Sequence, residues 1–188
     1  MATAPELESF VSSVTCPPDF DSFWERVLAE LKDIPLEPEI GPVPLRSTPD
    51  VNVYEVHYLS LGGIRIAGWY CVPAKGTGPF PTLIEFPGYK SEPSLARAWA
   101  QRGVAILSVA VRGKLRSNED FTPGYPGLLV SGIDSPDTYG YRGVISDCSR
   151  GIDFLLTRPE VDKERIFAHG ASQGGGLPLI TTALRSEI

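Results

Sequence analysis

The sequence has 188 residues and a formal net charge of −6, from 17 Lys and Arg against 23 Asp and Glu. With 42% hydrophobic residues, this length predicts one globular domain, residues 1–188, in which residues 1–50 form a helix and an extended connector. The acidic balance and the scattered basic residues argue against nucleic acid or an anionic membrane as a partner. The most apolar stretch, residues 103–111, is too short to span a bilayer.

The three cysteines, Cys16, Cys71 and Cys148, are far apart in the sequence and form no C-x-x-C pair. This spacing predicts neither a metal site nor a redox pair, and we expect no cofactor. An odd, low cysteine count fits a reducing compartment. Because the N-terminus lacks the basic and apolar regions of a secretory signal, we expect a cytoplasmic protein.

The first part of the chain predicts a helix followed by antiparallel strands. Residues 20–31 place apolar side chains on one helical stripe, with Asp19 as the expected N-cap. A proline-rich connector, residues 35–45, should be extended. Residues 51–73 then alternate as two strands around Gly62-Gly63, a pair typical of a hairpin turn.

The elements after the hairpin alternate between strands and helices. Their order is strand, helix, strand, long loop, helix, strand, helix, over residues 81–86, 94–102, 104–111, 112–140, 142–156, 165–170 and from 173 onward. Such alternation favours a parallel sheet with helices on both faces. The long loop is of a length that is usually functional or mobile in compact domains.

Residues 170–177, GASQGGGL, place Ser172 at G-x-S-x-G spacing between a predicted strand and a predicted helix. This context is typical of a nucleophile elbow, in which Gly170 and Gly174 avoid collisions with the neighbouring strand and helix. The N-terminus of the following helix suits a developing oxyanion, and the N–H of Gln173 is the expected first donor. The alternative is a glycine-rich packing turn without chemistry.

A second donor is expected from the loop after an earlier strand. Residues 86–90, FPGYK, stand where that loop belongs, and the Pro87-Gly88 turn aims the N–H of Tyr89 into the site. The alternative is that Tyr89 is an ordinary aromatic residue of a turn.

Several stretches of the sequence are similar to one known enzyme family. The most specific are GASQGGG and PEVDKERI at their mutual spacing; FPGY, VRGK, GIDSPDTYGYRGV, FDSFW and GGIRIAGWYCVP also fit. VRGK matches that family's Arg-Gly-Gln motif in two residues of three. Over residues 20–177 the chain thus resembles the acetyl xylan esterase / cephalosporin C deacetylase family, carbohydrate esterase family 7.

The resemblance implies an α/β-hydrolase fold and a serine carboxylesterase that removes acetyl groups from acetylated sugars or similar small esters through an acyl-enzyme. It implies Ser172 as the nucleophile, with Tyr89 and Gln173 supplying oxyanion-hole N–H groups. It also suggests a cytoplasmic hexamer and an acetylated ester or oligosaccharide as substrate. Because dienelactone hydrolases, lipases and prolyl-oligopeptidase-like peptidases share the elbow, the substrate class stays open.

The partners that activate such a serine are not found after it. In this fold they follow in the order Ser, Asp or Glu, His, yet Glu187 is the sole acid after Ser172 and no histidine follows. His57 lies in the predicted hairpin, and His169 should point from its strand into a flanking layer, so neither is expected to act as the base.

The sheet is also expected to lack strands, as the site lacks the acid and the histidine. We expect a mostly parallel, doubly wound sheet with an N-terminal antiparallel hairpin, from which the C-terminal strands are missing, so that an apolar strand edge lies open. A C-terminal complementing chain, or a catalytically inactive fragment or binding module, follows as the alternative to a complete esterase.

Two positions depart from the expected pattern. Lys114 stands where the family carries Gln, and lysine offers no acceptor. Pro178 lies early in the post-serine helix, where it crowds the carbonyl of Gly174 and predicts a distorted first turn.

Asp134 and Asp137 are expected to be loop or cap residues, and Arg112 is expected to brace its loop through an ion pair.

Overall fold

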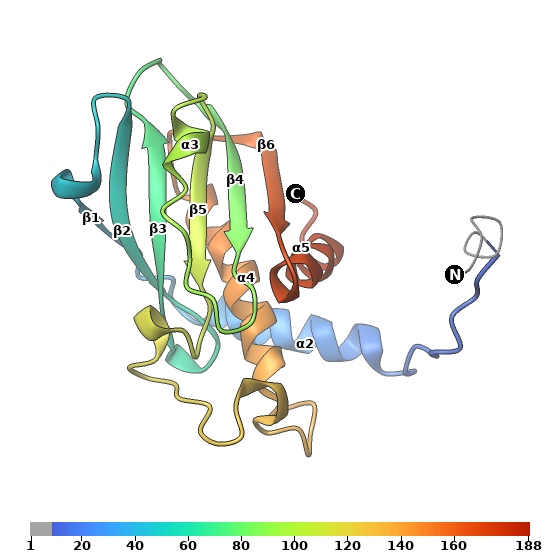
Figure 1. Cartoon of the computed structure of the whole chain (residues 1–188). Helices are drawn as coiled ribbons and strands as arrows, with labels where there is room; N and C mark the ends of the chain where they lie inside the picture. The colour runs from blue at the N-terminus through green and yellow to red at the C-terminus, as the bar shows by residue number, and fades with distance from the viewer. Residues whose placement is uncertain (1–8) are drawn as a thin grey trace, which may run out of the picture.

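The computed structural model describes residues 9–188, within which six strands form one open sheet in the spatial order β1-β2-β3-β5-β4-β6 (Figure 1). The strands are β1 Glu39–Pro42, β2 Val51–Leu59, β3 Arg65–Pro73, β4 Phe80–Phe86, β5 Ala105–Ala110 and β6 Val161–Gly170. The helices are α2 Phe20–Asp33, α3 Arg97–Ala100, α4 Gly140–Leu156 and α5 Gln173–Leu184. No helix of this described part is long and apolar enough to cross a membrane.

The sheet is mixed, which corrects the expectation of a mostly parallel sheet. Strands β1, β2, β3 and β5 pair antiparallel, and only the pairings of β4 with β5 and β6 are parallel within residues 9–188. The hairpin forms as expected, with Val56 opposite Gly68. The proline-rich connector was expected to be extended, and part of it also pairs as β1 at the edge of the sheet, where proline is tolerated. Antiparallel pairings therefore outnumber parallel ones in the described sheet.

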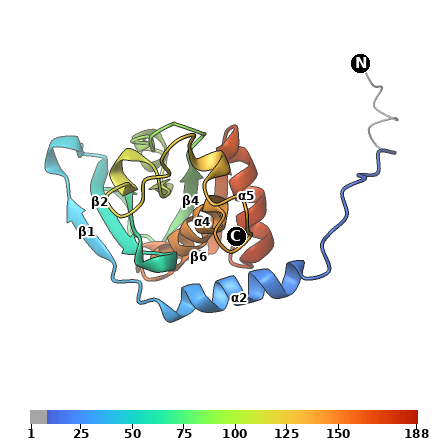
Figure 2. The ribbon, with the colours of Figure 1, turned by 90° about the horizontal axis from the view of Figure 1, so that it is seen from below.

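Helices cover both faces of the sheet (Figure 1). One apolar core gathers side chains of α4 and α5 with alternate residues of the strands, such as Tyr70, Leu107 and Val109. A smaller core on the other face joins Ala100 of α3 to Ile106 of β5. Every residue of β5 is buried, as its continuous apolar run predicts for a strand covered on both sides. In Figure 2, α2 runs along the outside of α4 and α5.

The N-cap residue of α2 is the expected one, whereas the length of the helix expected over residues 94–102 is corrected. Asp19 occupies the N-cap position of α2, but its side chain makes no capping hydrogen bond. Its carbonyl oxygen instead accepts hydrogen bonds from the Ser22 hydroxyl and the Phe23 N–H. The helix expected over residues 94–102 is a single turn, α3.

Strand β6 forms one of the two edges of the sheet, opposite β1. Within residues 9–188 this strand pairs only with β4, so one row of its backbone groups is open. Phe167, on this strand, is 54% exposed. An open strand edge with an exposed apolar side chain is a site where further polypeptide can pair. The expectation of an open edge is confirmed.

A buried ion pair joins the loop after β5 to α4. Arg112 donates from Nη2 and Nε to the two carboxylate oxygens of Asp147, at 2.8 and 3.0 Å, and its backbone N–H also donates to Asp147. The Asp147 side chain is fully buried and that of Arg112 is 8% exposed. A Cβ at Gly143 would lie 2.3 Å from the guanidinium, so this glycine makes room for it. Arg112 thus braces its loop, as expected.

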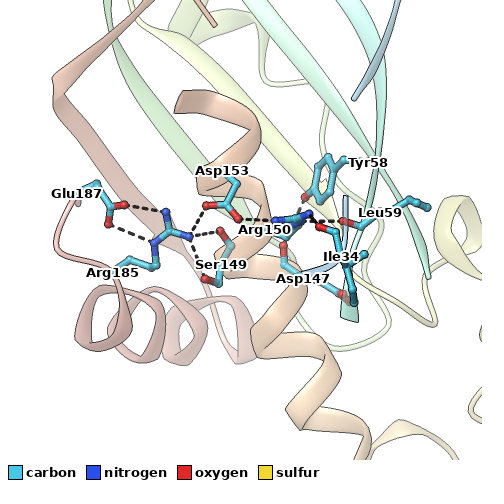
Figure 3. Close-up of polar contacts among 9 residues, drawn as sticks. All are labelled: Ile34, Tyr58, Leu59, Asp147, Ser149, Arg150, Asp153, Arg185 and Glu187. Carbon is cyan, nitrogen blue, oxygen red and sulfur yellow. Dashed lines mark hydrogen bonds and ion pairs between the residues drawn. The ribbon is translucent and has the colours of Figure 1, made fainter. Parts of the chain in front are cut away.

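A second polar network fastens the end of α5 to α4 (Figure 3). Arg185, after α5, donates to Asp153 of α4 at 2.7 Å and to Glu187 at 2.8 Å. Asp153 also accepts from Arg150 at 3.0 Å, and Arg150 in turn donates to the carbonyl of Leu59 at the end of β2. The network therefore fixes α4 and α5 relative to the sheet.

Replacing Asp147 by Asn tests the buried pair. The change leaves the Arg112 charge buried without a counter-charge, so the free energy of unfolding should fall by about 3–5 kcal/mol. Asp137→Asn is the matched control, because Asp137 pairs with Arg26 at 2.8 Å on the surface, where both side chains are more than half exposed. The control should lose less than about 1 kcal/mol. Urea unfolding measures both; equal losses would contradict the assignment.

Candidate active site

Ser172 lies between β6 and α5 in a backbone conformation that few residues adopt. Its φ is 59° and its ψ is −127°, directly before the first residue of α5. For a residue with a side chain, such a conformation costs about 1–3 kcal/mol and persists only where the surroundings impose it. The Ser172 carbonyl accepts a hydrogen bond from the Gly175 N–H at 2.8 Å, which joins the strained residue to the first turn of the helix.

The surroundings that impose this conformation are backbone atoms. A Cβ at Gly170 would lie 2.1 Å from the carbonyl oxygen of Gly174, and a Cβ at Gly174 would lie 2.1 Å from the carbonyl oxygen of Phe86. Gly170 and Phe86 are also register partners in the parallel β4–β6 pair. Glycine is therefore required at both positions, for the steric reason that the sequence suggested.

Helix α5 continues without a break through Pro178, so the predicted distortion of its first turn is not found. Proline at this position removes the hydrogen bond that the Gly174 carbonyl would accept in a regular helix. That carbonyl instead lies against Gly170, where the missing side chain leaves space for it.

The loop after β4 lies directly beside Ser172. A Cβ at Gly88 would be 3.9 Å from the Cβ of Ser172 and 3.5 Å from the carbonyl oxygen of Ala171. The loop turns tightly here, because the Gly88 carbonyl accepts from the Ser91 N–H at 3.1 Å and Lys90 has a φ of 57°. The structure therefore places the loop that carries Tyr89 beside Ser172. The role of the Tyr89 N–H stays a prediction.

Gln173 follows Ser172 at the first position of α5. The first N–H groups of a helix have no partner within it, so the N–H of Gln173 is free of intrahelical bonding. Its side-chain Oε1 accepts a hydrogen bond from the Tyr141 hydroxyl at 2.7 Å. Burial raises the pKa of Tyr141, and neighbouring Tyr139 and Tyr89 raise it further, so this hydroxyl stays protonated as a donor. No sequence pattern pointed to Tyr141, which lies 32 residues from Gln173.

A cavity of about 400 Å³ opens beside the elbow. Ser172, the loop after β4 and the polar side chains of Glu85 and His169 contribute to its wall. Glu85 accepts hydrogen bonds from the hydroxyls of Ser94 and Ser108, each at 2.7 Å. The cavity therefore combines an exposed serine hydroxyl with hydroxyl and carboxylate groups, which suit a polar substrate.

Neither histidine hydrogen-bonds to Ser172 in the described residues. His169 points toward the α3 layer, with its ring centroid 6.0 Å from that of Trp99 and its Nε2 3.8 Å from Glu85, although it also lines the cavity of Ser172. His57 lies half-buried in β2, and burial is the main cause of its lowered pKa. Asp137 pairs with Arg26 on the surface, and Asp134 is exposed in its loop. No group of three potential metal ligands occurs among the residues described.

Gly174→Ala and Gly176→Ala form a matched pair within α5. The first places a methyl group against the Phe86 carbonyl, so the free energy of unfolding should fall by about 3 kcal/mol or more. A Cβ at Gly176 meets nothing within 4 Å. The second change should therefore raise stability by about 0.5–1 kcal/mol through helix propensity. Thermal or urea unfolding compares them, and a stable Gly174→Ala protein would show that the elbow is not sterically fixed.

Comparisons with known proteins agree with this geometry. The family model described as acetyl xylan esterase matches residues 3–188. Acetyl esterase Axe7A of Xylanibacter ruminicola is 28% identical over 187 residues, which cover 92% of this chain and 42% of that protein.

Two solved structures are similar over essentially the whole chain. The acetyl xylan esterase from Paenibacillus sp. R4 has a TM-score of 0.87 and 34% identity, and the match covers 99% of this chain and 62% of that one. Acetyl xylan esterase 1 from Thermoanaerobacterium sp. JW/SL YS485 has a TM-score of 0.89 and 27% identity, with coverage of 100% and 61%. The α/β-hydrolase fold is thus confirmed, and the chain spans less than two thirds of the length of these relatives.

Proposed function

Because the chain belongs to the acetyl xylan esterase family, we propose that it forms the nucleophile-bearing part of a serine carboxylesterase. Its substrates are acetylated sugars or similar small esters. The observation that carries this proposal is the backbone of Ser172, held at φ 59° and ψ −127° between a strand and a helix. Strain of this kind at an exposed serine is the mark of a nucleophile elbow.

The proposed reaction has two halves. The Ser172 hydroxyl attacks the acetyl carbonyl carbon while a histidine takes its proton, and the carbonyl oxygen becomes an oxyanion bound by the N–H groups of Tyr89 and Gln173. The histidine then protonates the departing sugar oxygen, which leaves an acetyl ester on Ser172. In the second half, water replaces the sugar alcohol, so acetate is released and the serine regains its proton.

The base comes from polypeptide that the 188 residues do not include. Both histidines of the sequence are placed in the structure, and neither bonds to Ser172 in the described region. More than a third of each of these relatives lies outside the matched part. We place the missing histidine and its carboxylate on polypeptide that pairs with the free edge of β6, either in the same chain or in a complementing one.

Replacing Ser172 by Ala tests the nucleophile. The assay is hydrolysis of p-nitrophenyl acetate by the protein carrying any residues that its gene encodes after Ile188. Removing the nucleophile should lower kcat by about 10⁴-fold or more, because no acyl-enzyme forms. Ser22→Ala, an exposed serine on α2, is the control and should keep the wild-type rate. Unchanged hydrolysis by the Ser172→Ala protein would refute the assignment.

The 188 residues produced alone test the origin of the base. We expect them to hydrolyse p-nitrophenyl acetate no faster than their Ser172→Ala variant, since an elbow without a base does not activate the serine. Rapid hydrolysis that depends on Ser172 would instead place a base within these residues. His169→Gln would then be decisive, because His169 lines the same cavity as Ser172.

The acyl group and alcohol are proposed from the family and are tested by a substrate panel. Acetylated xylose oligomers, long-chain acyl esters and peptide substrates separate a deacetylase from a lipase-like or peptidase-like hydrolase, and a lactone separates it from a dienelactone hydrolase. A preference for long acyl chains would exclude the deacetylase. A cytoplasmic location and a homo-oligomer are proposed with it, and the molecular mass in solution tests the oligomer.

A further inference from the structure

The Lys114 ammonium contacts the loop that follows β4. Lys114 lies in the loop after β5, only 5% exposed, and its Nζ donates a hydrogen bond to the carbonyl oxygen of Gly88 at 2.8 Å. Burial lowers the pKa of this ammonium, and the nearby charge of Glu92 opposes the shift. A buried lysine is costly unless its charge is used. The hydrogen bond to the Gly88 carbonyl is the use that the structure shows for this charge.

The bond fixes the direction of one peptide group. The Gly88 carbonyl and the Tyr89 N–H belong to the same planar trans peptide, so they point in opposite directions. The carbonyl receives two donors on its own side, the Lys114 ammonium at 2.8 Å and the Ser91 N–H at 3.1 Å. The peptide plane is thus held from the carbonyl side, and the Tyr89 N–H is left on the other side. The Cα of Gly88, within the same loop, lies against Ser172.

We propose that Lys114 is a positioning residue of the oxyanion hole, which holds the Gly88–Tyr89 peptide so that its N–H faces the oxygen that develops charge at Ser172. The proposal rests on the esterase function proposed above. A hydrogen bond from an ammonium is stronger than one from a neutral amide, so lysine clamps the carbonyl more firmly than glutamine would. It also brings positive charge close to the forming oxyanion.

Two substitutions separate the donor from the rest of the side chain. Lys114→Met keeps an unbranched apolar stem and removes the donor, whereas Lys114→Gln keeps a neutral donor. In p-nitrophenyl acetate hydrolysis, Lys114→Met should lower kcat by about 10–100-fold with KM within about twofold, a fraction of the loss seen when an oxyanion donor is removed. Lys114→Gln should recover most of this loss. Wild-type kcat in Lys114→Met, or an effect confined to KM, would overturn the proposal.

A second measurement does not depend on turnover. With ¹⁵N-tyrosine labelling, the Tyr89 amide signal should shift or broaden in Lys114→Met, while those of buried Tyr58 and Tyr70 stay unchanged and report an intact fold. An unchanged Tyr89 signal would overturn the proposal. If the Ser172→Ala experiment refutes the esterase, this amide signal alone decides whether Lys114 orients the peptide, so the two failures are distinguishable.

Discussion

The crowding of backbone atoms between β4, β6 and α5 is the constraint on which the site depends. The carbonyl of Phe86 occupies the space of a side chain at Gly174, and the carbonyl of Gly174 occupies that of a side chain at Gly170. This contact forces the chain to turn at Ser172, and it also sets where the residues after Phe86 emerge. Ser172 and the loop that carries Tyr89 are consequently placed by the same contact.

The strain at Ser172 is offset by interactions that lie away from it. The parallel pairing of β4 and β6 holds one side of the turn, and the first turn of α5 holds the other. The opposite end of α5 is tied to α4 by Arg185 and Asp153, and α4 is tied to the loop after β5 by the Arg112–Asp147 pair. Lys114 lies in that same loop and donates a hydrogen bond to the Gly88 carbonyl, so these contacts extend to the peptide of Tyr89.

The parts that could be predicted from the sequence are those set by local spacing. Apolar periodicity and the G-x-S-x-G pattern predicted the strands, the long helix and the elbow, because each depends on residues close in sequence. Three features depend on contacts between distant segments: the pairing of β1 with β2, the Tyr141–Gln173 bond and the Lys114–Gly88 bond. The prediction from Pro178 was wrong, since α5 continues through this residue.

We propose that Ser172 carries the acyl group during turnover. The most direct measurement is an acid quench during p-nitrophenyl acetate hydrolysis by the protein with any residues encoded after Ile188, followed by peptide mass spectrometry. We expect one acetylated peptide, modified at Ser172, that disappears when the substrate is exhausted. Continued hydrolysis with the acetyl group on another residue, or with none trapped under conditions that show a burst of p-nitrophenol, would contradict it.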